Sequence, residues 1–231
     1  MINFISLNAI VTDLLEIIRQ AKVSRSEPIS KRQLEAWVHQ YRALLIKRDL
    51  DKGKMPNPDY IQEIPAVQLE VVDAADGGSI ETYTYVLKTK LALPNTIDLN
   101  YKSGFMYIGT IDGHELQFIP EGRSQWQQYK KYTQKDSLVF LRNNYLYLLS
   151  VNPIQYLTIR GVFEVPTEVS NFINPNMSVR SAGIDDPYPI PINMIPTLKE
   201  MILKTELNIE MQAPSDKTND SQHAVESNVV K

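Results

Sequence analysis

The fold class of this chain is decided by the stretch Leu138-Val-Phe-Leu-Arg-Asn-Asn-Tyr-Leu-Tyr-Leu-Leu-Ser-Val151. Two largely apolar runs, residues 138–141 and 145–151, lie on either side of the dipeptide Asn143-Asn144. Asparagine tolerates the left-handed backbone conformation that a two-residue hairpin turn requires. The stretch therefore predicts a β-hairpin whose two strands pair antiparallel.

Further strands are predicted on both sides of this hairpin. The runs are residues 67–71, 83–87, 106–111, 115–119 and 156–165. Asp76-Gly77-Gly78 and Asp112-Gly113 supply two of the turns between these runs. Several short strands joined by tight turns predict an antiparallel sandwich or a barrel-like body.

The N-terminal residues predict two amphipathic helices. Apolar side chains follow helical spacing from residue 6 to 20. Ser30 and Gln33 form a capping box at the start of a second helix, which ends near Arg48. The link between the helices, residues 21–29, is short, and we expect the two helices to form an antiparallel hairpin.

The C-terminal third predicts a strap, a helix and a tail. A helical turn is predicted near residues 166–173. Proline then alternates with tyrosine and isoleucine in the run Asp185-Asp186-Pro187-Tyr188-Pro189-Ile190-Pro191. This alternation favours an extended, stiff backbone. Helical spacing resumes over residues 192–211. Residues 214–231 have almost nothing apolar to bury, which predicts a disordered tail.

Together these elements predict an α+β protein with five segments. They are a helical hairpin (1–52), a linker (53–65), an antiparallel β-rich body (66–165), an extended proline-rich strap with a C-terminal helix (166–213), and the disordered tail (214–231).

Composition excludes several classes of function. The chain has 231 residues, no cysteine and a formal net charge of −3. Without cysteine there are no disulfides, thiolate nucleophiles or cysteine zinc sites. The charge lacks the basic excess of a dedicated nucleic-acid binder. No stretch approaches the roughly 20 apolar residues that span a bilayer, and we expect no membrane contact.

No catalytic, cofactor or metal site is predicted, and we do not expect an enzyme. The three histidines, His39, His114 and His223, are far apart in sequence, and no phosphate-binding glycine motif is present. Asp185 and Asp186 are adjacent carboxylates that are typical of a solvated turn before proline.

Two further clusters are open to a functional interpretation. Lys31, Arg42, Lys47 and Arg48 decorate the second helix, and a solvated helix face is their simplest explanation. The rings of Trp126, Tyr129 and Tyr132 suit either core packing or a carbohydrate-binding surface, and core packing is the simpler expectation.

Several short runs, in this order along the chain, carry a resemblance to a known group of proteins. They are Ser30-Lys31-Arg32-Gln33 to Tyr41-Arg42-Ala43-Leu44-Leu45, Lys47-Arg48-Asp49, Gln68-Leu69-Glu70, Lys88-Thr89-Lys90 to Leu93-Pro94, and Asp186-Pro187-Tyr188-Pro189-Ile190-Pro191. With these runs the chain resembles structural proteins of crAss-like tailed bacteriophages, in particular the first ring protein, the head–tail adaptor beneath the portal.

The resemblance implies a dodecameric ring in the virion, made in the host bacterial cytoplasm. Its expected partners are further copies of itself, the portal protein, the next tail ring or tail-tube protein, and passing double-stranded DNA without sequence-specific contact. From the apolar stripe of the second helix and from the strap we predict these assembly residues: Trp37, Tyr41, Arg42, Leu45, Arg48, Tyr188 and Ile190. Tyr188 and Ile190 are expected to anchor the strap on an adjacent subunit or ring.

Two alternatives remain open. Another tail ring or a head-completion protein shares every feature above and differs only in its position in the particle. A carbohydrate-binding module or small hydrolase is the more distant alternative, and it depends on the tyrosine and tryptophan side chains of the β-rich body.

Overall fold

The hairpin at Asn143-Asn144 is confirmed in the computed structural model. Strands β5 (Leu138–Arg142) and β6 (Tyr145–Ser150) pair antiparallel, with Arg142 opposite Tyr145. Asn143 and Asn144 have φ angles of 50° and 63°. Both turn residues therefore adopt the left-handed conformation that this hairpin type requires.

The structure describes residues 5–20, 29–72, 85–99, 104–124, 126, 129–132, 136–172 and 183–207. Some predicted features lie outside these residues: the turn at 76–78, the start of the run at 83–87, and the tail at 214–231. Among the described residues, no helix combines the length and apolar character needed to cross a membrane.

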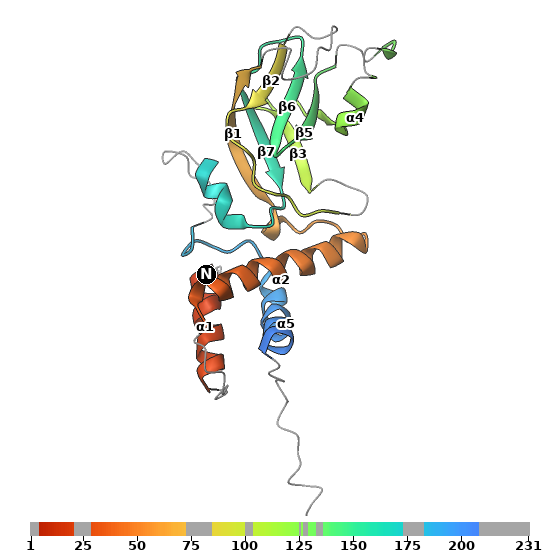
Figure 1. Ribbon diagram of the computed structural model, residues 1–231. Helices are drawn as coiled ribbons and strands as arrows, with labels where there is room; N and C mark the ends of the chain where they lie inside the picture. The colour runs from red at the N-terminus through yellow and green to blue at the C-terminus, as the bar shows by residue number, and fades with distance from the viewer. Residues whose placement is uncertain are drawn as a thin grey trace, which may run out of the picture.

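Seven strands form one sheet that rolls into a nearly closed barrel (Figure 1). The remaining strands are β1 (Gln62–Val71), β2 (Tyr85–Thr89), β3 (Phe105–Thr110), β4 (Gln117–Phe118) and β7 (Tyr156–Gly161). Their order is β3-β7-β1-β2-β6-β5-β4. A short turn and a bridge between Gly109 and Glu115 bring the two ends of this order together, and the chain is an α+β protein with a barrel-like body.

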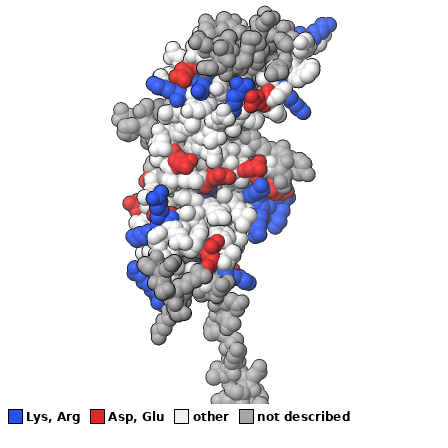
Figure 2. All heavy atoms as spheres, in the orientation of Figure 1, with Lys and Arg blue, Asp and Glu red and all other residues white. Residues whose placement is uncertain are grey.

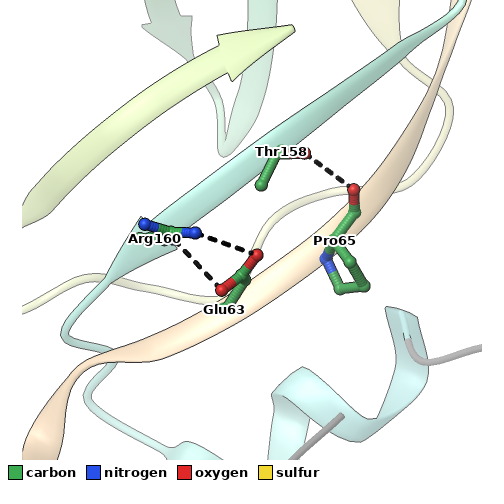
Figure 3. Close-up of polar contacts among 4 residues, drawn as sticks. All are labelled: Glu63, Pro65, Thr158 and Arg160. Atoms are coloured by element: carbon green, nitrogen blue, oxygen red, sulfur yellow. Dashed lines mark hydrogen bonds and ion pairs between the residues drawn. The ribbon is translucent and has the colours of Figure 1, made fainter. Parts of the chain in front are cut away.

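Strand β1 begins at Gln62, four residues earlier than the body predicted from the sequence. Its pairing with β7 shifts register between Ile64 and Val67, which is the position of Pro65. Proline cannot donate to a strand ladder and marks a bulge. The Thr158 hydroxyl donates to the Pro65 carbonyl at 2.8 Å, and Arg160 pairs with Glu63 at 3.1 Å (Figure 3). These contacts hold the strand together on both sides of the bulge.

The apolar interior of the barrel forms one core, and three helices pack around a second. They are α1 (Leu7–Gln20), α2 (Lys31–Asp51) and α5 (Ile195–Leu207), which follows the short 3-10 helix η4 (Ile192–Met194). The Ser30 hydroxyl accepts the Gln33 N–H at 3.2 Å, and the predicted N-cap is thereby confirmed. Figure 1 shows α1 and α5 on the side of α2 that faces away from the barrel, and Lys199 of α5 pairs with Asp13 of α1.

Short elements complete the chain. They are the 3-10 helices η1 (Pro58–Tyr60) and η3 (Pro166–Phe172) and the helix α4 (Glu121–Ser124). A small apolar cluster of Ile46, Tyr60, Ile97 and Val162 joins α2 to the barrel. Helix α2 therefore lies between two cores and contacts both.

Candidate assembly interface

Arg42 ties together three parts of the chain. It lies on α2 and is fully buried. Its Nε donates to the Pro189 carbonyl of the strap at 2.7 Å, and one terminal nitrogen donates to the Phe163 carbonyl, just after β7, at 2.8 Å. The other terminal nitrogen is buried without a hydrogen-bond partner. One guanidinium thus joins the helices, the strap and the barrel.

Tyr188 and His39 contact Arg42 or each other, and we call these three side chains the polar joint. The Arg42 guanidinium lies 5.6 Å from the centre of the Tyr188 ring, and a hydrogen bond of 2.8 Å links the Tyr188 hydroxyl to His39 Nδ1. Burial, with a smaller contribution from the charge of Arg42, lowers the pKa of His39 to about 4. Burial also raises the pKa of Tyr188 and lowers that of Arg42 to about 10. At neutral pH the joint therefore holds a single positive charge.

The structure corrects the prediction that Arg42 belongs to a solvated helix face. An arginine is seldom fully buried, and sequence position alone places Arg42 with the other cations of the helix. Two of its nitrogens instead donate to the main-chain carbonyls of Pro189 and Phe163. Lys31 and Arg48 are exposed, as predicted for that face.

The strap packs on its own chain. Residues 187 and 6 form an isolated bridge, and the Tyr188 N–H donates to the Ile5 carbonyl at 3.0 Å. The side chains of Tyr188 and Ile190 are 7% and 5% exposed, in the core formed by the three helices. In this structure they anchor the strap on the helices of the same subunit, and their role between subunits stays a prediction.

The remaining predicted assembly residues lie along α2. Tyr41 is buried and donates from its hydroxyl to Glu206 of α5 at 2.8 Å. Trp37 and Leu45 are half-buried and pack against the helical core. Arg48 is exposed. Of these four side chains Arg48 is the most accessible to a neighbouring molecule.

A groove runs between α2, α5 and the barrel, and we call it the α2 groove. It holds about 520 Å³. The residues that line it are Gln40, Tyr41, Ala43, Leu44, Lys47, Arg48, Ile97, Asp98, Glu164, Met201 and Thr205. Leu44, at 37% exposure, gives it an apolar patch, and two cations lie across from two carboxylates. Figure 2 shows Lys and Arg side chains gathered near the C-terminal end of α2, with acidic groups beside them.

Large aromatic side chains are exposed on the barrel after α4. Trp126 is 66% exposed, Tyr129 is 74% exposed and Tyr132 is 87% exposed. With Lys130 and Lys131 they form a surface that we call the aromatic projection. The aromatic projection lies at the end of the barrel that faces away from the three helices (Figure 1). The prediction that these rings pack in the core is wrong, because all three are exposed and the core of the barrel consists mainly of aliphatic side chains from other residues.

Neither the burial of Arg42 nor the exposure of the three aromatic rings is apparent from local sequence patterns. Helical spacing marks Trp37 and Leu45 as members of an apolar stripe, but nothing local to Arg42 indicates which carbonyls it meets. Aromatic spacing alone does not distinguish core from surface. Within the described residues, no group of three or more His, Asp or Glu side chains is arranged to hold a metal ion.

Comparisons with known proteins assign a family. A family model described as phage tail ring protein 2, of the crAss-like phage type, matches residues 9–228. No match was found among curated proteins. The matched range includes the helices, the barrel, the strap and most of the segment after α5.

Proposed function

Because the chain belongs to the crAss-like phage family of tail ring protein 2, we propose that it is a non-enzymatic subunit that assembles with its own copies into a ring of the virion tail. The observation that carries the proposal is the length of the family match, which extends over both the barrel and the helices. Since the match spans the barrel, the helices and the strap, the family assignment applies to the whole subunit and not to one part of it.

The finer points of the assembly are also proposals. We propose a dodecameric ring that extends the DNA channel between a component on the portal side and the next tail component. The matched family is the second ring type, and the first-ring position that the resemblance suggested is not confirmed. A net charge of −3 supports passage of DNA without tight binding, since tight binding needs many cationic contacts to phosphates.

The α2 groove is the surface that we propose for contact between copies. In a closed ring each copy presents one surface to the copy before it and a different one to the copy after it. The groove offers the apolar Leu44 together with Arg48, and Asp98 and Glu164 lie across from them. A neighbour that buries Leu44 and pairs with these charges would set the angle between subunits.

Native mass spectrometry tests this proposal on the full chain. We expect the chain to form a closed oligomer, either alone or when mixed with the portal protein or another tail ring protein of the same phage. A monomer in all of these mixtures would overturn the ring function. Leu44→Asp and Arg48→Glu should each prevent oligomer formation and leave the subunit folded.

Leu91→Ala is the matched control for these variants. Leu91 is 52% exposed and does not line the α2 groove. It should therefore assemble like the natural sequence. If Leu44→Asp and Arg48→Glu also assemble normally, the contact between copies lies elsewhere and the groove assignment is wrong.

A further inference from the structure

We propose that the aromatic projection docks on a different protein of the tail, one that offers an apolar pocket bordered by carboxylates. This inference depends on the proposed ring function, because it concerns the partner of a ring subunit. It assigns the end of the molecule opposite the helices to contact between different components of the tail (Figure 1).

Two rings of the projection pack against each other, and the third contacts a lysine. The ring centres of Trp126 and Tyr129 are 6.0 Å apart and tilted by 48°, a geometry that aromatic pairs favour. The Lys131 ammonium lies 5.4 Å from the centre of the Tyr132 ring. Successive turns connect the segment, since the Trp126 N–H donates to the Arg123 carbonyl and the Tyr129 N–H to the Trp126 carbonyl, each at 3.2 Å.

The base of the projection is fixed to the barrel. Arg142 of β5 donates to the Glu121 carboxylate at 2.6 Å, and the Ser124 hydroxyl donates to the Glu121 carbonyl at 2.7 Å. The Ile119 N–H donates to the Val139 carbonyl at 2.8 Å. The barrel thus holds the root of the segment, which reduces the ordering cost of binding through the exposed rings.

The exposed area is large enough to matter for binding. A buried aromatic residue covers about 150–250 Å². Three rings at the observed exposures would contribute about 450 Å², more than half of the roughly 800 Å² that one partner buries in a standard interface. Tryptophan and tyrosine are also the residues that most often dominate binding energy.

Charge defines the partner. Arg123, Lys130 and Lys131 stand on or beside the projection, and none of the salt bridges found among the described residues includes them. The carboxylate of Glu121, at its base, is already paired with Arg142. A surface that covers the projection therefore needs carboxylates of its own around an apolar pocket.

A second copy of this chain fits this requirement poorly at the α2 groove. Asp98 and Glu164 line that groove, but Lys47 and Arg48 line it as well. If the projection of one copy entered the groove of another, its lysines would meet two cations of the same sign. Like charges in contact disfavour a partner, and the groove and the projection are thus suited to different occupants.

Binding measurements with purified tail proteins test the proposal. The portal protein, the other ring proteins and the tail-tube protein of the same phage are immobilised one at a time, and the full chain is passed over each. The triple variant Trp126→Ala, Tyr129→Ala, Tyr132→Ala should bind its partner at least about tenfold more weakly than the natural chain. Lys130→Glu with Lys131→Glu should also weaken binding, and added salt should weaken binding of the natural chain.

Leu91→Ala is the control, because it removes an exposed apolar side chain outside the projection and should leave binding unchanged. Native mass spectrometry of the triple variant separates this proposal from the ring function. Intact rings with lost capture support the docking surface. Lost rings would show that the projection contacts a second copy and would overturn it.

Three other outcomes also contradict the proposal. In the first, the natural chain forms rings but none of the tail proteins captures it. In the second, the triple variant is captured as well as the natural chain. The third is a glycan-array signal of the natural chain that the triple variant lacks, which would assign the aromatic rings to carbohydrate. A chain that never forms rings would instead count against the proposed function.

Discussion

At the scale of single residues, Arg42 has the largest predicted effect on stability. It is fully buried, and its two donors meet the Pro189 and Phe163 carbonyls. Arg42→Met removes the charge but leaves both carbonyls buried without a donor. We expect a loss of about 3 kcal/mol in the free energy of unfolding, measured by urea titration. Arg48→Met, on the exposed face of the same helix, should change it little; equal effects of the two would contradict the joint.

His39 predicts how stability depends on pH. Its pKa is about 4 in the folded chain, against 6.5 for an ordinary histidine, because burial and the charge of Arg42 disfavour protonation. As the pH falls through 6.5 the unfolded chain takes up this proton first, and folding is penalised. The stability from a neutral His39 is present above pH 6.5 and is lost between pH 6.5 and 4.

The expected loss from His39 between pH 7 and 5 is about 2 kcal/mol. Urea titrations at both pH values measure it. His39→Gln cannot titrate but can still hydrogen-bond to the Tyr188 hydroxyl, and its stability should fall less over the same range. If both chains lose the same amount, the acid sensitivity comes from other groups.

The residue scale also shows where prediction from sequence ends. Ser30 and Asn143 act through neighbours only a few residues away, and both are correctly predicted to cap a helix and to form a turn. Arg42 acts through a carbonyl 121 positions away and another 147 positions away. Such partners are set by the tertiary fold, and no local pattern reports them.

At the scale of elements, the strap is part of the helical core. Tyr188 and Ile190 are buried among side chains of α1, α2 and α5, and the backbone of the strap pairs with residues 5 and 6. The proline pattern predicts an extended, stiff segment, whereas the backbone bends at residues 189 and 190, where the Ile190 N–H donates to the Tyr188 carbonyl at 2.8 Å. The proline pattern also does not reveal what covers the segment, because this depends on where α2 lies.

The double variant Tyr188→Ala, Ile190→Ala tests the role of the strap. Removing two buried side chains leaves a cavity in the helical core and should cost about 3–5 kcal/mol. Hydrogen exchange should rise in α1 and α5, while the amides of β5 and β6 keep their protection because the barrel has its own core. Equal loss of protection in the barrel and the helices would show one cooperative unit instead. Met55→Ala, at a side chain that is 91% exposed, is the control.

At the scale of the whole molecule, two cores meet along α2. The strands of the barrel were predictable from their local patterns, and some of them pair with the next strand in the chain, as β5 does with β6. The pairings of β7 with β1 and β3, and of β2 with β6, join strands far apart in sequence and were not predictable. The position of α2 between the barrel and the other helices was not predictable either, since it depends on contacts such as Ile46 with Val162. In a ring, the shape of each subunit determines the position of the next one. A regular ring therefore requires the same angle between the barrel and the helices in every subunit.

Arg42 should hold this angle, and a chain without cysteine is well suited to a test. Val71→Cys on the barrel and Lys204→Cys on α5 are both at exposed positions and accept spin labels. With Arg42 in place, double electron–electron resonance should give one narrow distance distribution. Arg42→Lys keeps the charge, but a single ammonium lacks the forked donors that meet both carbonyls. The distribution should broaden while circular dichroism stays unchanged. Arg48→Lys with the same labels is the control and shows the width of the distance distribution expected when the joint is intact. If Arg42→Lys gives an equally narrow distribution, the apolar contacts of Ile46 set the angle by themselves.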